Sequence, residues 1–336
     1  MPHAIPRDTI LVTGGAGYIG SHAVLALRDA GRKVVVLDDL STGFAWALPA
    51  DVPLVQGDVA DTQLLAALFA AHGVLAIMHF AGSILVHESV AKPLLYYRNN
   101  TAASRTLLEA AITAGVPHFI FSSTAAVYGQ PEVVPIVEAS PLAPINPYGA
   151  SKMMTERMLA DAAAAEPFNY AALRYFNVAG ADPQGRSGQS GLIATHLIKI
   201  AAEAATGKRD HVAIYGEDYP TPDGTCIRDY IHVSDLAAAH VAALDALISD
   251  PARSLTLNVG YGHGFSVREV LDAVDDVLGY MLDRRTGPRR AGDPPSLVAA
   301  NAAILATLDW QPRHDDIHRI IADAISWEER LRIIRA

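Results

Sequence analysis

Residues Leu11–Asp39 read LVTGGAGYIGSHAVLALRDAGRKVVVLDD, and this stretch decides the fold. An apolar run leads into a cluster of glycines, a helix-like stretch follows, and a second apolar run ends in Asp38. Gly14, Gly17 and Gly20 permit a tight turn and let backbone N–H groups approach a pyrophosphate at the N-terminus of the helix. Strand, glycine-rich turn, helix and second strand in this order predict a dinucleotide-binding βαβ unit.

Acidic side chains at two strand ends indicate which dinucleotide would bind. Asp38 comes 18 residues after Gly20, where a carboxylate accepts hydrogen bonds from both ribose hydroxyls of adenosine. It would repel a 2′-phosphate, so the sequence favours NAD over NADP. The alternative is a tight turn followed by a surface acid. Asp58 ends the expected third strand and could reach the adenine amino group, or could instead cap the helix that follows.

Short β-branched runs alternate with Ala- and Leu-rich helical patterns over the first half of the chain. We expect strands at Ile10–Thr13, Lys33–Leu37, Pro53–Gln56, Ala76–Phe80, His118–Ser122 and Ala171–Phe176. We expect helices between them, for example at Thr62–His72, Asn99–Ala114 and Gly149–Glu166. This alternation predicts an α/β fold with a Rossmann-type, doubly wound parallel sheet.

The pattern changes after Asn177. Polar, turn-rich loops are expected at Ala181–Ser190 and Glu217–Thr225, and a helix is expected at His196–Thr206. We therefore expect a NAD-binding Rossmann domain over residues 1–178 and a smaller C-terminal α/β substrate domain over residues 179–336. A segment at about 231–247 is a candidate to return to the first domain.

The bulk composition disfavours several classes of function. The 336 residues carry a formal net charge of −10, whereas nucleic-acid binding needs a Lys- and Arg-rich surface. Cys226 is the single cysteine, so no intrachain disulfide forms, and no apolar run is long enough to cross a membrane. Without a signal-peptide pattern, we expect a cytoplasmic protein. The tract HDDIH at His314–His318 is interpreted as a helix start with acids near its positive end, not as a metal site.

A tyrosine and a lysine four residues apart form the candidate catalytic pair. Tyr148 and Lys152 share one face of the helix expected after Pro147. A phenol with an ordinary pKa of about 10 is a poor base, but a nearby ammonium and an oxidised nicotinamide both favour phenolate. Tyrosinate could then take the proton of a sugar hydroxyl as hydride leaves the same carbon. Thr124, just beyond Ser122 at a strand end, is placed to hydrogen-bond the reacting oxygen. Taken alone, the pair could equally be a surface helix pair.

Nine motifs spread over nearly the whole chain carry a resemblance to a known family. They are TGGAGYIGS (Thr13–Ser21), HFAG (His79–Gly82), ESV (Glu88–Val90), YYRNN (Tyr96–Asn100), FSSTAAVYG (Phe121–Gly129), YGASK (Tyr148–Lys152), RYFN (Arg174–Asn177), DGTCIRDYIHV (Asp223–Val233) and PRRAGD (Pro288–Asp293). With them the chain resembles the extended short-chain dehydrogenase/reductases, and most closely the UDP-glucose 4-epimerase family. The last three motifs together are the more specific ones.

The resemblance assigns roles to single residues of this sequence. Tyr148 matches the catalytic base, Lys152 its cofactor-orienting partner, and Thr124 the catalytic Ser or Thr. The implied NAD contacts are Gly14, Gly17, Tyr18, Ile19, Gly20, Asp38, Asp58, Val59, Phe80, Ala81, Gly82, Asn99, Ser122, Tyr148, Lys152 and Tyr175. The implied UDP-sugar contacts are Thr124, Tyr148, Asn177, His196, Leu197, Ala213, Ile214, Tyr215, Arg228, Arg290, Asp293 and Leu297.

The chemistry that the resemblance implies involves no net oxidation or reduction. Tightly bound NAD takes hydride from C4 of UDP-galactose or UDP-glucose, the 4-keto sugar turns while UDP stays held, and hydride returns to the opposite face. Such an isomerase must bind the nucleotide strongly and the hexose loosely. In this family the helices equivalent to Asn99–Ala114 and Gly149–Glu166 pack between two subunits, so a homodimer is expected.

Three residues depart from the family's pattern. Ile84 stands where some close relatives carry a lysine near the cofactor, and His196 stands where some have an asparagine that contacts the substrate. Leu297 falls where strict glucose/galactose enzymes often have a bulky tyrosine. The smaller side chain implies room for UDP-GlcNAc and UDP-GalNAc, or an altered preference that extends to UDP-pentoses.

Three other functions share parts of this pattern. A 4,6-dehydratase needs acid and base groups directly after Thr124, where this chain has Ala125 and Ala126. A nucleotide-sugar reductase with net redox chemistry would use releasable NADPH, which Asp38 disfavours. A non-catalytic NAD-binding regulator would have no use for the tyrosine–lysine pair.

Overall fold

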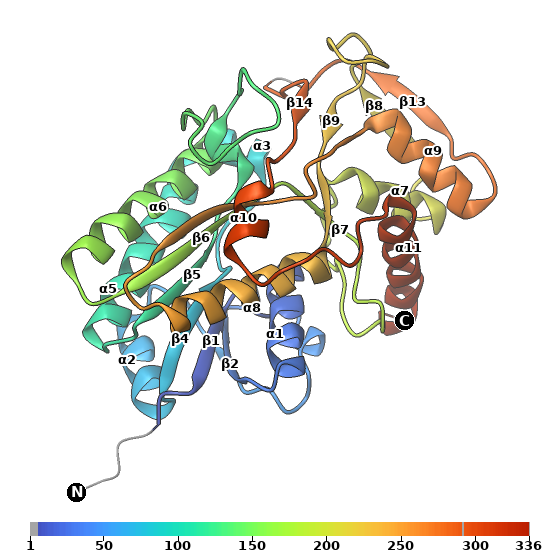
Figure 1. Ribbon diagram of the computed structural model, residues 1–336. Coiled ribbons are helices and arrows are strands. Elements are labelled where there is room, and N and C mark those ends of the chain that lie inside the picture. Colours follow the sequence, from blue (N-terminus) through green and yellow to red (C-terminus); the bar gives the residue numbers. More distant parts are fainter. Residues whose placement is uncertain (1–5, 291, 336) are drawn as a thin grey trace, which may run out of the picture. The chain divides into compact units, whose positions relative to one another are not determined.

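A seven-stranded sheet has the strand order β11–β6–β5–β4–β1–β2–β3, and all its strands except β11 lie within the first 175 residues (Figure 1). The structure is a computed structural model that describes residues 6–290 and 292–335. The strands are β1 (Thr9–Thr13), β2 (Lys33–Asp38), β3 (Leu54–Gln56), β4 (Val74–His79), β5 (His118–Ser122), β6 (Asn169–Tyr175) and β11 (Leu255–Val259). The six strands expected from the sequence are all present, with ends that shift by two residues at most.

The order of the strands reverses at β1, which pairs in parallel with both β2 and β4. β2 pairs in parallel with β3, and β4 with β5, which in turn pairs with β6. Such a reversal is the topological switch point of a doubly wound sheet, and ligands bind beyond the carboxyl ends of the strands there. The predicted Rossmann-type fold is confirmed, and it places the turn after β1 beside the loop after β4.

Helices cover both faces of this sheet (Figure 1). On one face α2 (Thr62–Ala71), α5 (Ala103–Thr113) and α6 (Pro147–Ala165) share a core with alternate strand residues, such as Leu11, Ile77, Phe119 and Phe121. On the other face lie α1 (Tyr18–Asp29) and α8 (Val233–Ser249), joined near their ends by a 2.5 Å bond from Arg32 to Asp245. Since both faces are covered, the strands are apolar along nearly their whole length.

The segment before α5 differs from the sequence expectation. We expected Asn99 to open a helix, but it lies inside a π-helical turn, η2 (Tyr97–Ala102). Helical backbone begins earlier, in α3 (Val86–Ala91) and again in α4 (Pro93–Tyr96), where Pro93 occupies the first turn. Asn99 therefore is not at a helix N-terminus, and its side chain donates to Ser83 Oγ at 3.0 Å. Two single turns complete the unit, η1 (Ala45–Ala47) and η3 (Ala125–Tyr128).

The N-terminus of α2 corrects the capping alternative for Asp58. The N-cap residue is Asp61, whose Oδ1 accepts hydrogen bonds from the backbone of Gln63 and Leu64 at 3.0 Å. Asp58 lies three residues too early and instead accepts a bond from Ala60 N at 2.8 Å. The HDDIH tract does begin a helix, α11, with Asp316 as N-cap. No group of three or more His, Cys, Asp or Glu side chains within the described ranges could hold a metal ion.

The remaining chain forms short sheets and helices. The strands are β7 (Asn177–Ala179), β8 (Val212–Tyr215), β9 (Ile227–Arg228), β10 (Tyr230–His232), β12 (Phe265–Ser266), β13 (Arg284–Gly287) and β14 (Ser296–Leu297). They pair as β10–β7, β12–β9–β14 and β13–β8. The helices are α7 (Leu197–Ala205), α9 (Val267–Leu278), α10 (Ala302–Thr307) and α11 (Ile317–Ile334), and α11 packs on both α7 and α9. None of the helices in the described part of the chain is long and apolar enough to span a membrane.

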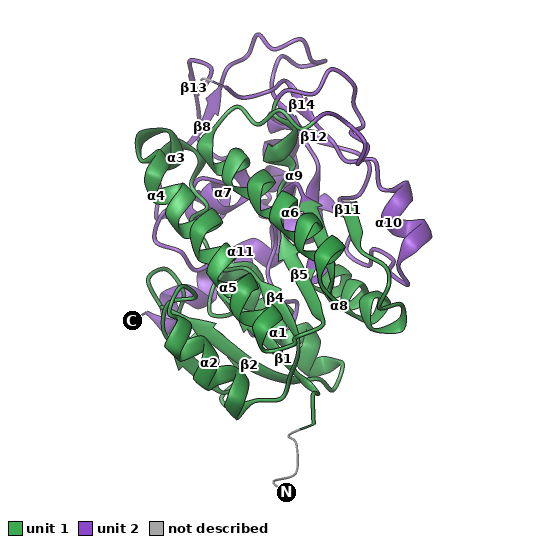
Figure 2. Ribbon diagram, turned by 90° about the vertical axis from the view of Figure 1, so that its left-hand side faces the viewer, with its two compact units in different colours: residues 1–129, 142–174, 237–257 green, residues 130–141, 175–236, 258–336 purple. Residues whose placement is uncertain are grey.

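The chain divides into two units that are not continuous in sequence (Figure 2). Unit 1 contains the residues up to 129 together with 142–174 and 237–257, and unit 2 contains 130–141, 175–236 and the residues from 258 onward. The sequence predicts one boundary near residue 178 and a segment at about 231–247 that is a candidate to return to the first domain. Which ligand each of the two domains binds stays a prediction. Residues 1–5, on which part of the signal-peptide prediction falls, lie outside the described residues.

Candidate active site

The glycine turn after β1 forms a cradle that larger residues would fill. Gly14 has a φ of +69°, and a Cβ there would lie 2.5 Å from the backbone N of Ala81. A Cβ on Gly20 would overlap the Gly14 carbonyl oxygen. Gly17 is the N-cap residue of α1, and no capping side chain accepts a hydrogen bond from the first N–H groups of the helix. This backbone matches the expected pyrophosphate site of NAD.

Asp38 sits at the carboxyl end of β2 with its carboxylate already oriented. Its Oδ2 accepts a hydrogen bond from Ala16 N at 2.9 Å, and its Oδ1 accepts one from Leu40 N at 2.8 Å. Burial raises the pKa of Asp38, and the two backbone bonds oppose that rise. Each oxygen keeps a second lone pair, so the side chain fits the ribose of NAD. Contact with the ribose hydroxyls stays a prediction.

The other expected NAD contacts differ in their exposure. Tyr18 and Ile19 open α1 and are partly buried, while Val59 and Ser122 are buried. Phe80 and Ala81 are partly buried after β4, and Gly82 packs so closely that a Cβ would lie 2.8 Å from Asn100 Oδ1. Asp58 is exposed, Ile84 is 61% exposed, and Tyr175 belongs to unit 2.

The tyrosine–lysine pair lies in the first two turns of α6, with the strand-end threonine beside it. Asn146 caps the helix by accepting from Gly149 N at 2.9 Å, and Pro147 occupies the first turn. Lys152 is buried, and its Nζ donates to the carbonyl oxygen of Ser122 at 2.9 Å. Thr124 hydrogen-bonds Tyr148. The structure thus brings Tyr148, Lys152 and Thr124 together within unit 1.

Burial dominates the acid–base properties of this pair. It raises the pKa of Tyr148, against which the bond from Thr124 works. Burial also lowers the pKa of Lys152 to about 8, although the nearby Glu156 raises it. The sequence predicts that two cations together, the Lys152 ammonium and an oxidised nicotinamide, lower the pKa of the phenol, and this stays a prediction. The Lys152 ammonium is directed to the backbone carbonyl of Ser122, and a positive nicotinamide bound here would add to the stabilisation of the phenolate.

A buried ion pair beneath the catalytic helix was not assigned a role from the sequence. Arg174 at the end of β6 donates to Glu156 through Nη2 at 2.6 Å and through Nε at 3.0 Å. Ser123 donates to the same carboxylate, and Tyr128 Oη lies 2.9 Å from Arg174 Nη1. Glu156 follows Lys152 by one helical turn, on the same face. The spacing of Tyr148, Lys152 and Glu156 could have placed Glu156 on the catalytic face of α6, but it gives no sign of Arg174.

Asn100 is a second residue that sequence reasoning missed. It is buried, and its Oδ1 accepts from Ser83 N at 2.7 Å. Its Nδ2 donates to the Ser83 carbonyl oxygen at 3.0 Å and to Ser151 Oγ at 3.1 Å. The side chain therefore ties the loop after β4 to the catalytic helix α6. The motif YYRNN contains it, but nothing in the sequence distinguishes it from Asn99.

In unit 2, three of the expected UDP-sugar contacts lie close together. Arg228 Nη2 lies 3.5 Å from Asp293 Oδ1, and Arg228 Nη1 donates to the Pro294 carbonyl at 2.9 Å. Leu297 is the register partner of Arg228 where β14 pairs with β9. Arg228 and Leu297, the position expected to affect the choice of sugar, therefore lie on adjacent strands.

The expected uracil edge forms a second group in unit 2. Ala213, Ile214 and Tyr215 are the last residues of β8, which pairs in parallel with β13. The guanidinium of Arg290 lies 4.1 Å from the ring centroid of Tyr215, and both side chains are exposed. Such a contact is a cation–π interaction and presents a flat, charged edge. Ala291, within the PRRAGD motif, lies outside the described residues.

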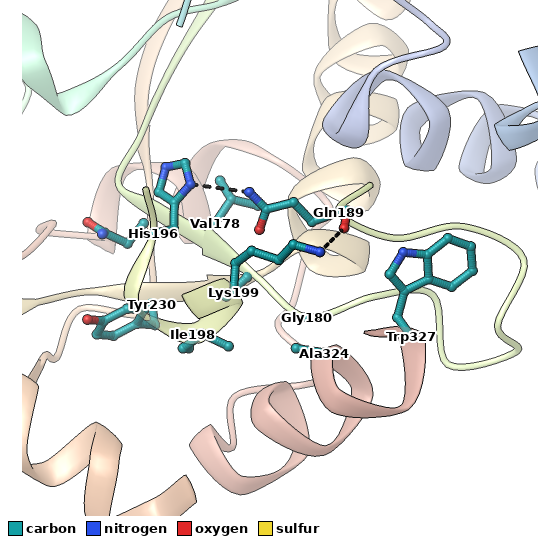
Figure 3. A pocket seen from close by; sticks show the side chains of 11 residues that line it. Val178, Gly180, Gln189, His196, Ile198, Lys199, Tyr230, Ala324 and Trp327 are labelled. Carbon is teal, nitrogen blue, oxygen red and sulfur yellow. Dashed lines mark hydrogen bonds between the residues drawn. The ribbon is translucent and has the colours of Figure 1, made fainter. Parts of the chain in front are cut away.

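A pocket at the start of α7 forms the third group (Figure 3). Asn177 and His196, both expected at the substrate, line it together with Gln189 and Lys199. His196 is the N-cap residue of α7, and Leu197 is the first residue of the helix. Gln189 and Lys199 were not expected, because each lies in a stretch that reads as an ordinary loop or helix. The structure thus distributes the expected substrate residues of unit 2 over three groups.

Comparison with known proteins supports one family over nearly the whole chain. The sequence model of the NAD dependent epimerase/dehydratase family matches residues 10–260. UDP-glucose 4-epimerase of Azospirillum brasilense is 58% identical over 328 residues, which cover 98% of this chain and 93% of that protein.

Two solved structures agree with this match. UDP-glucose 4-epimerase from Stenotrophomonas maltophila, crystallised with bound NAD and formylated UDP-arabinopyranose, is 39% identical with a TM-score of 0.93, covering 98% of this chain and 100% of that chain. The UDP-Glc/GlcNAc 4-epimerase from Campylobacter jejuni is 48% identical with a TM-score of 0.83, covering 96% of this chain and 99% of that chain. On the combined grounds of the glycine cradle, the Tyr148–Lys152–Thr124 cluster and these matches, the chain belongs to the NAD dependent epimerase/dehydratase family.

Proposed function

We propose that this chain is an isomerase that interconverts UDP-galactose and UDP-glucose by inverting the configuration at C4. The observation that carries the proposal is the cluster of Tyr148, Lys152 and Thr124 at the strand ends of a Rossmann unit with an oriented Asp38. Relatives up to 58% identical bear the name UDP-glucose 4-epimerase, and solved relatives hold NAD or UDP-sugars. Bound NAD supplies a reversible two-electron acceptor, so C4 is oxidised and then reduced with no net change.

The chain's own groups handle the proton of the C4 hydroxyl. Tyr148 Oη takes that proton while C4 is oxidised and returns it when C4 is reduced. Thr124 holds the reacting oxygen and, through its bond to Tyr148, favours the phenolate. Lys152 supplies a positive charge near Tyr148 and Thr124, and its bond to the Ser122 carbonyl fixes its position. A preorganised cation in a buried site stabilises developing negative charge at low reorganisation cost.

The nucleotide half of the substrate is assigned to unit 2. We expect Arg228, Arg290 and Asp293 to bind UDP, together with Asn177, His196 and Leu197 and the edge Ala213–Tyr215. An acidic protein must supply cations locally to bind a diphosphate, and arginines make bidentate bonds to phosphate oxygens. The homodimer and the cytoplasmic location also stay predictions of the family resemblance.

A single assay tests the proposal. The purified protein is given UDP-galactose with no added NAD, and UDP-glucose is measured by chromatography. We expect conversion to equilibrium, because the NAD stays bound through each turnover and none has to be supplied. Conversion only after NADPH addition, with a reduced product, would instead indicate the reductase alternative. Loss of water from the sugar would indicate a 4,6-dehydratase, which Ala125 and Ala126 disfavour.

The side chain at position 297 is expected to set the range of sugars. Leu297 is only partly buried and is smaller than the tyrosine of strict relatives. We therefore expect comparable turnover of UDP-GlcNAc and UDP-glucose, and we expect Leu297→Tyr to lose UDP-GlcNAc turnover while keeping that of UDP-glucose. The Campylobacter jejuni relative is named for both sugars. Inactivity of the unaltered protein on UDP-GlcNAc would contradict the expectation, and rates with UDP-xylose would extend the test to pentoses.

A further inference from the structure

A buried pair of opposite charges joins α7 to the C-terminal helix α11. The side chain of Lys199 is 5% exposed and that of Glu328 is 1% exposed, and Lys199 Nζ donates to a carboxylate oxygen of Glu328. Lys208 donates to the other oxygen of the same carboxylate. Burying charges is costly, and an apolar pair of similar volume often serves stability as well or better. Stability alone is therefore a weak explanation for this buried ion pair.

Lys199 also contacts the loop that precedes α7 (Figure 3). Its Nζ donates a 2.7 Å hydrogen bond to the backbone carbonyl of Gln189. The side chain of Gln189 in turn donates from Nε2 to Nδ1 of His196, at 3.3 Å. His196 is the N-cap residue of α7, the helix that carries Lys199. The bond from Lys199 to Gln189 therefore ties the start of the segment 189–196 to the helix that follows its end.

α11 supports the same loop at two further points. Trp327 Nε1 donates to Ser190 Oγ at 3.3 Å, and Arg335 donates to the Ser190 carbonyl oxygen. The loop passes so close to the indole that a Cβ on Gly188 would overlap the Trp327 ring. The backbone from Gly188 to Ser190 is therefore fixed by the last helix.

The bond from Gln189 determines which ring nitrogen of a neutral His196 carries the proton. An amide nitrogen only donates, so Nδ1 accepts from Gln189 and a neutral ring carries its proton on Nε2. The His196 side chain is exposed, although it belongs to the pocket that Asn177 also lines. Nε2–H is thus the hydrogen-bond donor of the neutral ring.

We propose that Lys199, anchored by Glu328, is a positioning residue that holds Gln189 and His196 so that the imidazole donates to an oxygen of UDP. The inference rests on the proposed function, under which the chain binds a UDP-sugar. Lys199 acts on binding and leaves the proton transfer at Tyr148 untouched. Its loss is therefore felt in the affinity for the nucleotide and not in the rate at saturating substrate.

The test compares Lys199→Met with Lys208→Met, since both lysines bind Glu328 but only Lys199 reaches Gln189. The Kd of UDP is measured by calorimetry and the kinetics with UDP-galactose. For Lys199→Met we expect the Kd of UDP and the KM to rise about tenfold. This corresponds to the loss of the hydrogen bond from His196 to the charged UDP. We expect kcat to change less than about twofold. Lys199→Arg is expected to recover most of the affinity, and Lys208→Met to bind UDP as the unaltered protein does.

A double variant keeps the test decisive if Lys199→Met does not fold. Lys199→Met/Glu328→Met replaces the pair by apolar side chains, which buried pairs tolerate, and it still lacks the donor to Gln189. Unchanged UDP affinity in either variant, or equal losses in Lys199→Met and Lys208→Met, would overturn the inference. If the unaltered protein binds UDP but turns over no UDP-sugar, the proposed function fails while the affinity comparison still stands. If it does not bind UDP, both fail.

Discussion

Replacing Tyr148 by phenylalanine is expected to lower kcat for UDP-galactose by about 10²–10⁴-fold, the usual contribution of a positioned general base. The variant removes the oxygen that would take and return the C4 proton, while the ring still fills its place on α6. The neighbouring Thr124 hydroxyl cannot replace it, because an alcohol is a far weaker acid than a phenol. Initial rates of UDP-glucose formation measure the loss.

The same variant separates catalysis from cofactor binding. The glycine cradle and Asp38 are untouched by Tyr148→Phe, so we expect the purified variant to carry as much NAD as the unaltered protein, measured after denaturation. Tyr280, which is 52% exposed in unit 2, supplies the matched control, and Tyr280→Phe is expected to keep full activity. A Tyr148→Phe protein with normal turnover would remove the tyrosine from the mechanism.

Breaking the ion pair beneath the catalytic helix is expected to have the largest effect on stability. Glu156→Gln removes the carboxylate that neutralises the buried Arg174 guanidinium, which costs about 3–5 kcal/mol of unfolding free energy. Both side chains are less than 9% exposed. Denaturant unfolding measures the loss. Asp161→Asn, which breaks the exposed pair with Arg157 on the same helix, is the control and is expected to leave the unfolding midpoint unchanged.

The same substitution is expected to change the pH dependence of turnover. Lys152 faces Tyr148 and Glu156 on its own helix, His79 on β4, and Phe121 on β5. Burial and the Lys152 charge lower the pKa of His79 to about 3, so that ring stays neutral. With a pKa of about 8, Lys152 is charged below that pH and loses its charge as the pH rises through it.

Glu156 raises the pKa of Lys152, so its removal extends the uncharged range of the lysine downward. We expect the alkaline fall in kcat of Glu156→Gln to begin at a lower pH than in the unaltered protein. Glu156→Met/Arg174→Met should regain stability because neither charge is left unpaired, yet it should keep the altered pH profile. A profile that matches the unaltered protein in both variants would show that the pair acts on stability alone.

Local chemistry made most of unit 1 readable from the sequence. A strand followed by glycines, or a tyrosine four residues before a lysine, is set by neighbours along the chain. Those patterns predicted the strands, the cradle and the catalytic cluster. The wrong helix start at Asn99 and the wrong capping alternative for Asp58 have the same origin. A helix start depends on which of several residues the backbone presents, and here Asp61 caps α2 and Pro93 opens α4. The predicted adenine contact of Asp58 stays a prediction.

Contacts between distant parts of the chain were beyond such patterns. Glu156 and Arg174 are 18 residues apart, and Lys199 and Glu328 are 129 apart. No periodicity relates such positions, so their charges read as ordinary solvated residues. The division into units has the same cause, because Ile136 N donates to Val298 O at 2.8 Å and draws residues 130–141 into unit 2.

The position of β11 at the end of the sheet has a consequence for synthesis on the ribosome. β6 is made long before β11, and the stretch of unit 2 from Tyr175 to Leu236 is translated between them. Until Leu255–Val259 emerges, the nascent Rossmann sheet ends in β6, whose unpaired backbone groups can recruit a foreign strand. A truncated polypeptide that stops near residue 178 would keep that open edge permanently, and chaperones that shield such edges should matter most during this interval.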